Sequence, residues 1–147
     1  MTNEEKQLLL VDLSARLPYG VKVKYAIPTL LISIKKDSNG IKVITESTYS
    51  EHSYNIEDIK PYLRPMDSMT KKETKELFKE IGFKYTCNTC GIPAHYNYEF
   101  AEQIKGIPTI TNVEFIKVID WLNAHHFDYR GLIEKGLALE APEGMYN

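Results

Sequence analysis

The sequence has little of what marks several common classes of protein. Its 147 residues include two cysteines, one tryptophan and only short apolar runs. Two cysteines are too few for the disulfide framework of a small secreted domain. The short apolar runs argue against a transmembrane helix. The polar start MTNEEKQ is unlike a signal peptide, because it has neither a basic nor an apolar region. We therefore expect a reduced, cytoplasmic protein that does not enter the membrane.

An excess of charge of one sign is also missing. The formal net charge is -2, with 26% charged and 43% hydrophobic residues, which is ordinary for a soluble globular protein. A chain so close to neutrality is not a general binder of polyanions, so nucleic-acid binding would need a local basic patch. The length fits one domain or two small ones.

Three capping boxes predict three helices. Each box pairs a threonine with a glutamate three residues later, and each side chain bonds the other residue's backbone N–H. The three pairs are Thr2–Glu5, Thr70–Glu73 and Thr111–Glu114. They predict helices over residues 6–17, 70–81 and 112–126. The third helix has the broadest apolar face, which predicts that it is the main core helix; the face consists of Phe115, Ile116, Val118, Ile119 and Leu122.

Alternating apolar and polar residues predict short strands between the first two helices. They cover residues 21–25, 30–36 and 41–47, a looser fourth segment covers 49–54, and residues 137–141 form a closing strand. A helical turn at 55–60 and an extended piece at 62–65 complete this part. We expect an α+β fold with a small antiparallel bent sheet or an SH3-like barrel, and three main helices packed across it. A boundary at residues 66–70 divides the chain into 1–66 and 67–147, packed as one unit.

A pair of cysteines in a predicted hairpin at residues 83–98 could bind zinc. Cys87 and Cys90 have the C-x2-C spacing that lets two thiolates grip one metal ion. A structural zinc needs four ligands, and the sequence offers His95 nearby and His125 from the third helix. The alternatives are two ordinary reduced thiols or, with less support, a redox pair, because no helix opens after the first cysteine.

A second candidate site follows the third helix. His125 and His126 stand close to Asp128 and Tyr129, and a histidine beside a carboxylate can act as a general base. No nucleophile motif or phosphate-binding loop accompanies them. The alternative interpretation is structural, because a histidine at a helix C-terminus bonds the last carbonyl groups and suits the helix dipole.

A third candidate is a basic and aromatic surface on the strands. Outward lysines with tyrosines nearby could follow a phosphate backbone and stack on bases, or contact another protein. The alternative is that lysines on sheet edges prevent association between edges. The candidate surface consists of Lys22, Lys24, Tyr25, Lys42, Tyr62 and Arg64, with Tyr96 and Tyr98 from the hairpin.

Two stretches of the sequence resemble sequences of known proteins. IEDIKPYLRPMDSMT at 56–70 and DWLNAHHFDYRGLIEKGLALEAP at 120–142 resemble small uncharacterised proteins encoded by gut Bacteroidales, their phages and their mobile elements. The resemblance covers about a third of the chain and includes neither Cys87 nor Cys90. It implies a small cytosolic accessory protein of phage or mobile-element origin, and it supplies no catalytic residue or cofactor.

These observations favour a non-enzymatic protein-binding module that acts on a host or phage protein, for example by modulating a host system. The first alternative is a nucleic-acid or small-nucleotide binder that uses the lysines and tyrosines of the strands. The second is a small zinc-binding protein or an enzyme centred on Cys87, Cys90, His125 and His126.

Overall fold

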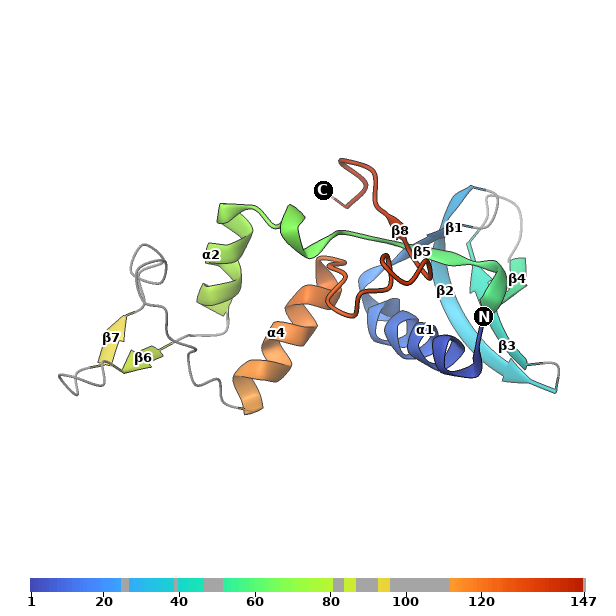
Figure 1. The fold of residues 1–147 in the computed structure, drawn as a ribbon, viewed down its shortest axis with the longest axis horizontal. Helices are drawn as coiled ribbons and strands as arrows, with labels where there is room; N and C mark the ends of the chain where they lie inside the picture. Colours follow the sequence, from blue (N-terminus) through green and yellow to red (C-terminus); the bar gives the residue numbers. More distant parts are fainter. Residues whose placement is uncertain are drawn as a thin grey trace. The chain divides into compact units, whose positions relative to one another are not determined.

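The chain divides into two compact units, and the first is built from both ends of the sequence. The computed structural model describes residues 1–24, 27–38, 40–46, 52–80, 84–86, 93–95 and 112–146. The first unit consists of Met1–Ser68 and Leu122–Asn147, and the second of Met69–Trp121. Figure 1 shows the elements in chain order.

The first unit begins with helix α1 (Asn3–Arg16), as the capping box predicts. The hydroxyl of Thr2 accepts the N–H of Glu5 at 3.2 Å, and the Glu5 carboxylate accepts the N–H of Thr2 at 2.6 Å. A short 3-10 helix, η1 (Leu17–Tyr19), follows α1. Gly20 then adopts a φ of 72°, which a side chain would strain, and the chain turns into the sheet.

The six-stranded sheet is mixed and open. Its strands are β1 (Lys22–Lys24), β2 (Pro28–Asp37), β3 (Gly40–Thr45), β4 (His52–Asn55), β5 (Lys60–Leu63) and β8 (Leu139–Glu140). Their order is β4-β3-β2-β1-β5-β8. The first four pairings are antiparallel, and β5 pairs with β8 in parallel. Two further 3-10 turns, η2 (Ile56–Asp58) and η3 (Met66–Ser68), flank β5.

The α+β class is confirmed, whereas the SH3-like barrel is wrong. A barrel requires the two outermost strands to pair with each other, and here β4 and β8 remain the two edges of the sheet. The bend itself is present, because β2 changes register between Leu31 and Ser33 as it passes from β1 to β3. The sheet is also not purely antiparallel, since the short β8 joins β5 in parallel.

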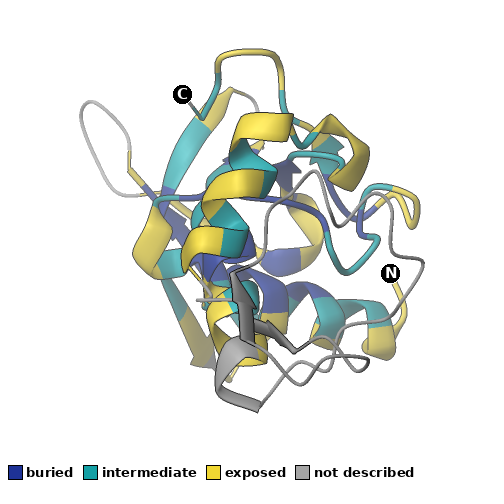
Figure 2. Cartoon of the chain, turned by 90° about the vertical axis from the view of Figure 1, so that its left-hand side faces the viewer, coloured by how far each residue is buried: buried dark blue, intermediate teal, exposed yellow. Residues whose placement is uncertain are grey.

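The apolar core of the first unit lies where α1 meets the sheet. Leu9 and Leu13 of α1 are fully buried, and they pack with residues from the strands and from the C-terminal segment. Figure 2 shows buried residues gathered in the interior and exposed residues on the outer surface of the described ribbon. The cluster consists of Leu9, Leu13, Val21, Val23, Leu31, Val43, Ile56, Ile59, Leu63, Leu132, Leu137 and Ala138.

The second unit contains helix α2 (Lys71–Glu80) and a small hairpin of β6 (Lys84–Thr86) and β7 (Pro93–His95). The predicted capping box of α2 is present, because the Thr70 hydroxyl accepts the N–H of Glu73 at 3.2 Å and the Glu73 carboxylate accepts the N–H of Thr70 at 2.9 Å. That α2 covers the sheet stays a prediction.

Helix α4 (Asn112–Ala124) differs from the predicted main core helix. Phe115 and Ile116 are 57% and 60% exposed, and in the predicted apolar face only Leu122 is buried. The described core cluster belongs to the first unit, and α4 enters that unit only from Leu122 onward. The prediction of a five-residue core face is therefore wrong for the N-terminal half of the helix.

Candidate functional site

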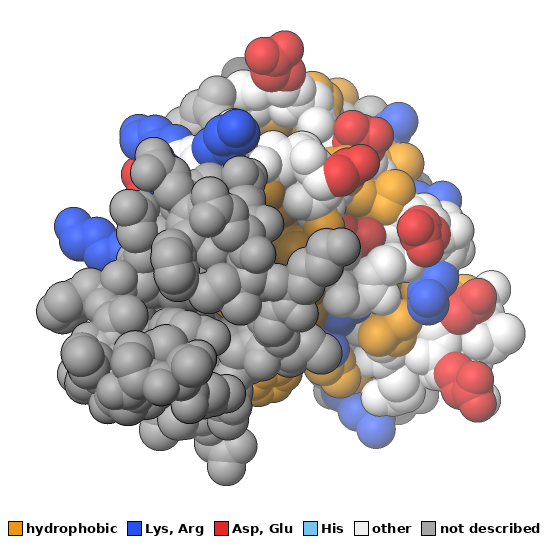
Figure 3. Space-filling view, turned by 60° about the vertical axis from the view of Figure 1, so that its left-hand side comes forward, with side chains coloured by type: hydrophobic (Ala, Val, Ile, Leu, Met, Phe, Trp, Pro, Cys, Tyr) orange, Lys and Arg blue, Asp and Glu red, His pale blue; other side chains and the backbone are white. Residues whose placement is uncertain are grey.

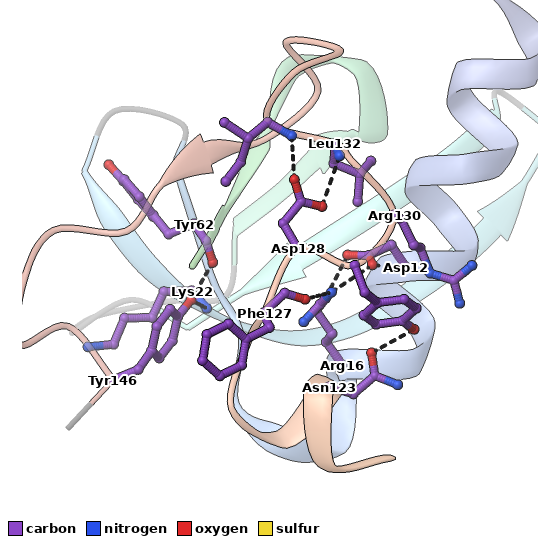
Figure 4. A network of polar contacts seen from close by, with 12 residues as sticks. Asp12, Arg16, Lys22, Tyr62, Asn123, Phe127, Asp128, Arg130, Leu132 and Tyr146 are labelled. Carbon is purple, nitrogen blue, oxygen red and sulfur yellow. Dashed lines mark hydrogen bonds and ion pairs between the residues drawn. The ribbon is translucent and has the colours of Figure 1, made fainter. Parts of the chain in front are cut away.

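A buried ion pair on α1 organises the polar interior of the first unit. Asp12 and Arg16 lie one helical turn apart, and both are 0% exposed. Arg16 donates from Nε to one Asp12 oxygen at 2.8 Å and from Nη2 to the other at 3.0 Å. The same Nη2 donates to the carbonyl oxygen of Phe127 at 2.8 Å. The guanidinium thus links α1 to the segment that follows α4, as Figure 4 shows.

Tyr129 and Arg130 extend this arrangement. Nε of Arg130 lies 3.4 Å from the Asp12 carboxylate, so one buried carboxylate faces two guanidinium groups. The Tyr129 ring lies 5.5 Å from the Arg16 guanidinium and 4.9 Å from that of Arg130. Its hydroxyl donates to the Asn123 side chain at 3.0 Å. These contacts hold residues 127–130 against α1.

His126, two residues after the end of α4, has a backbone conformation that glycine normally adopts. Its φ is 59°, the only positive φ of a non-glycine residue among those described, and its side chain is 4% exposed. Burial lowers its pKa to about 4; the charges of Arg16, His125 and Arg64 act in the same direction, while a hydrogen bond with the backbone of Tyr19 raises it. Nδ1 has no hydrogen-bond partner among the described residues. The ring is therefore neutral near pH 7.

Tyr146, near the C-terminus, packs on this histidine. The two rings are stacked, with centroids 3.8 Å apart and planes inclined by 26°. The Tyr146 hydroxyl accepts the backbone N–H of Lys22 at 3.0 Å and donates to the carbonyl oxygen of Tyr62 at 2.8 Å. Burial raises the pKa of Tyr146 to about 12, so the hydroxyl stays protonated and can donate.

Asp128 has a structural task. Its two carboxylate oxygens accept the backbone N–H groups of Leu132 at 2.9 Å and Ile133 at 2.8 Å. It thereby caps the turn that carries Leu132 into the core. The histidine–carboxylate general base considered from the sequence receives no support from this geometry, since the carboxylate is aimed at backbone donors.

The lysines of the candidate surface are engaged to different degrees. Lys22 donates from Nζ to the carbonyl oxygen of Met145 at 3.2 Å, and Lys42 donates to the Asn55 side chain at 2.6 Å. Lys24 is exposed. In the described part of the surface drawn in Figure 3, acidic and basic side chains alternate with apolar ones instead of gathering by sign.

Of the other candidate surface residues, only Tyr62 and Arg64 are described by the structure. Tyr62 is only 8% exposed, so its ring is part of the interior and offers no face to a base. The Arg64 guanidinium lies 4.2 Å from the centre of the Phe127 ring. The remaining three, Tyr25, Tyr96 and Tyr98, lie outside the described residues.

The proposed zinc ligands fall mostly outside the described part of the chain. Cys87 and Cys90 lie outside it, and His95 is placed in β7 by its backbone alone. His125 is half-buried at the end of α4. Within the described ranges, no three histidine, cysteine, aspartate or glutamate side chains gather as metal ligands. The zinc site stays a prediction.

The outer surface of α1 is a feature that the sequence reasoning missed. From Gln7 to Tyr19 the only charged residues are Asp12 and Arg16, and both are buried. The exposed residues of this stretch are Gln7, Val11, Ser14, Pro18 and Tyr19. The available signal was the spacing of the two charges by four residues, which allows them to pair with each other inside the fold.

The fold and these contacts define an α+β protein with an open mixed sheet, whose C-terminal segment completes a buried polar interior. Comparison with known proteins adds no relative, because the chain matches no protein-family model, no curated protein and no solved structure. None of the helices in the described ranges is long and apolar enough to cross a lipid bilayer.

Proposed function

We propose that this chain is a non-enzymatic protein-binding module that contacts its partner through the α1 outer face, defined as Gln7, Val11, Ser14, Pro18 and Tyr19. The spacing of Gln7, Val11 and Ser14 places them on one side of α1, and Pro18 and Tyr19 follow in η1. A surface helix normally turns its charges outward and its apolar side chains inward. Between Gln7 and Tyr19 the two charged residues are both buried, while Val11 is 48% and Tyr19 39% exposed.

The uncharged α1 outer face is the observation that carries this proposal. The centre of a protein–protein contact is depleted of charged residues and enriched in tyrosine, because charges are costly to desolvate. A partner that presents an uncharged surface would therefore bind here without leaving a buried ion unpaired. The resemblance at 56–70 and 120–142 supports a phage or mobile-element origin and a host or phage protein as the partner.

The interior of the first unit also favours binding over catalysis. Asp128 caps a turn, and His126 is buried against Tyr146. The Asp12 carboxylate is occupied by Arg16 and approached by Arg130. Each of these titratable groups has a contact that stabilises the fold, which supports assigning them to structure.

An affinity purification with two matched variants tests the proposal. The intact chain, Val11→Lys and Met66→Lys would each be immobilised and exposed to lysate of a Bacteroidales host. Met66 is 44% exposed, close to the value for Val11, but it lies in η3 and outside the α1 outer face. We expect one host protein to be retained by the intact chain and by Met66→Lys and to be lost with Val11→Lys.

The retained protein would then be purified and its affinity measured directly. A charge placed in the centre of a contact typically costs at least tenfold in affinity, or about 1.4 kcal/mol. Equal binding of all three forms would remove the α1 outer face from the proposal. If the intact chain, immobilised at high density, retains no protein from the lysate, the result would count against the binding function itself.

A further inference from the structure

One edge of β5 is covered by three separate pieces of the chain in succession. The first piece is β1, which pairs Lys24 with Lys60 and Val23 with Pro61. The third is the segment after α4, because the Arg64 N–H donates to the carbonyl oxygen of His126 at 2.8 Å. Between them lies Tyr62, whose carbonyl oxygen accepts a hydrogen bond from the Tyr146 hydroxyl.

The Tyr146 hydroxyl occupies this middle position. In the register of β1 and β5, the next pair after Val23–Pro61 places Lys22 opposite Tyr62. Pro61 has no N–H and suits a pair without hydrogen bonds, so the bonded pairs of this antiparallel ladder fall on either side of it. At the Lys22–Tyr62 pair the hydroxyl accepts from the Lys22 N–H and donates to the Tyr62 carbonyl oxygen, at 3.0 and 2.8 Å. It thus stands in for a direct ladder bond, as Figure 4 shows.

The ring of Tyr146 and the carbonyl group of Met145 also make contacts with the first unit. Residues 142–146 are called the tail. The ring stacks on His126 with centroids 3.8 Å apart. Lys22 Nζ donates to the carbonyl oxygen of Met145 at 3.2 Å and lies 6.0 Å from the centre of the Tyr146 ring. These contacts favour tyrosine over phenylalanine, because phenylalanine lacks the hydroxyl that bridges Lys22 and Tyr62. We call the arrangement of Lys22, Tyr62 and His126 the Tyr146 site.

The chain reaches the Tyr146 site through a short exposed connection. The last sheet contact is the N–H of Ala141, which donates to the carbonyl oxygen of Leu63 at 2.7 Å. Residues 142–144 are exposed, and Met145 and Tyr146 are half-buried. The contacts of Met145 and Tyr146 therefore decide whether residues 142–146 stay bound.

We propose that the Tyr146 site is a peptide-binding site that the chain fills with its own tail, and that the tail of a second copy occupies it in exchange. In such an exchange the tail of one copy makes, with the other copy, the same contacts that it makes within its own chain. No new complementary surface is needed. The chain's own tail competes at an effective concentration in the millimolar range, because its tether is short. Exchange between copies is therefore favoured at high protein concentration, whereas altering the resident tyrosine opens the site to an added peptide.

A peptide-binding measurement on the full-length chain tests this proposal. The probe is a fluorescent synthetic peptide of residues 141–147, and the proteins are the intact chain, Tyr146→Ala and Tyr146→Phe. We expect both variants to bind the peptide at least about tenfold more tightly than the intact chain, because their own tails compete less well. A peptide with phenylalanine at the tyrosine position should bind about tenfold more weakly, since two hydrogen bonds are lost. A peptide with Glu143→Gln is the matched control and should bind unchanged.

Light scattering during size-exclusion chromatography tests the second copy as the occupant. The intact chain at millimolar concentration should form a dimer that Tyr146→Ala does not form. Equal binding of the tyrosine and phenylalanine peptides, or no binding to a folded variant, overturns the site. If Tyr146→Ala is unfolded by circular dichroism, the milder Tyr146→Phe decides. Peptide binding without a dimer overturns the second copy as the occupant.

Discussion

Asp12 and Arg16 are the residues whose burial most needs a physical account. Removing an ion from water costs several kcal/mol, and the cost is offset only when the partners are well placed and hydrogen-bonded. Here the carboxylate receives two bonds from Arg16 and lies near Arg130, and Arg16 also reaches the Phe127 carbonyl oxygen. The intact pair therefore adds little net stability. Losing one member is costly, however, because the other would remain buried and unpaired.

Replacing Asp12 by alanine should destabilise the first unit by about 3–5 kcal/mol, because Arg16 would remain buried without its counter-charge. The free energy of unfolding, measured by urea titration, checks this. Ser14→Ala on the exposed side of the same helix is the control and should change stability by less than about 0.5 kcal/mol. The double variant Asp12→Leu with Arg16→Met should recover much of the loss. A loss below about 1 kcal/mol for Asp12→Ala would contradict the assigned contacts.

Stability should also depend on pH through His126. Its folded pKa of about 4 lies below the ordinary value of 6.5, so the unfolded chain binds more protons between these values. The contribution is therefore present above pH 6.5 and is lost as the pH falls toward 4, by up to about 3 kcal/mol. Unfolding titrations between pH 4 and 7 check this. His126→Asn tolerates the left-handed backbone and should flatten the slope; an unchanged slope in that variant would assign the dependence to other groups.

At the scale of elements, α1 has three distinct sides. One packs Leu9 and Leu13 on the sheet, one holds the ion pair against residues 127–130, and the third is the α1 outer face. Asp12 and Arg16 lie on the buried polar side of α1, so the helix departs from a simple amphipathic pattern, in which all charged residues face solvent. The proposed binding surface is this third side of α1 and not the lysine-bearing strands.

The capping box of α1 should contribute measurably to the stability of the first unit. Thr2→Ala removes the acceptor for the Glu5 N–H and should cost about 1 kcal/mol. Urea unfolding measures the change. Thr2→Ser keeps the hydroxyl and serves as the control, with an expected loss of only a few tenths of a kcal/mol. Equal losses for both variants would show that the methyl group and not the cap is responsible.

At the scale of the whole molecule, sequence reasoning succeeded where the determining contacts are local. The caps of α1 and α2 lie within three residues, and the strands follow a two-residue period, so both could be predicted. The contact between Arg16 and Phe127 spans 111 residues, and that between Lys22 and Tyr146 spans 124. No local pattern encodes which distant carbonyl group or strand a side chain will meet. The open edges, the parallel β8 and the Tyr146 site therefore became visible only in the fold.

The first unit should fold without the second. The described core cluster lies entirely in the first unit, and Arg64 pairs with His126 and Asp128 close to the two points where the chain leaves and re-enters it. We expect a chain in which a Gly/Ser linker replaces residues 69–121 to unfold cooperatively and to keep the raised pKa of Tyr146. Thermal circular dichroism and the absorbance of tyrosinate on alkaline titration measure these properties. A non-cooperative transition together with an ordinary tyrosine titration would contradict this expectation.

The long span of these contacts also governs when the first unit can be completed during synthesis. Chains grow at about 5–20 residues per second, so Phe127 follows Arg16 out of the ribosome after roughly 6 to 22 s. During that interval α1 has no carbonyl group from residue 127 to bond, and the core lacks Leu132 and Leu137. Until then, helix α1 and the early strands form an incomplete unit, and part of its apolar surface is uncovered. Apolar surface exposed on an incomplete chain is prone to association, so the arrival of the C-terminal segment ends the period in which this unit is vulnerable.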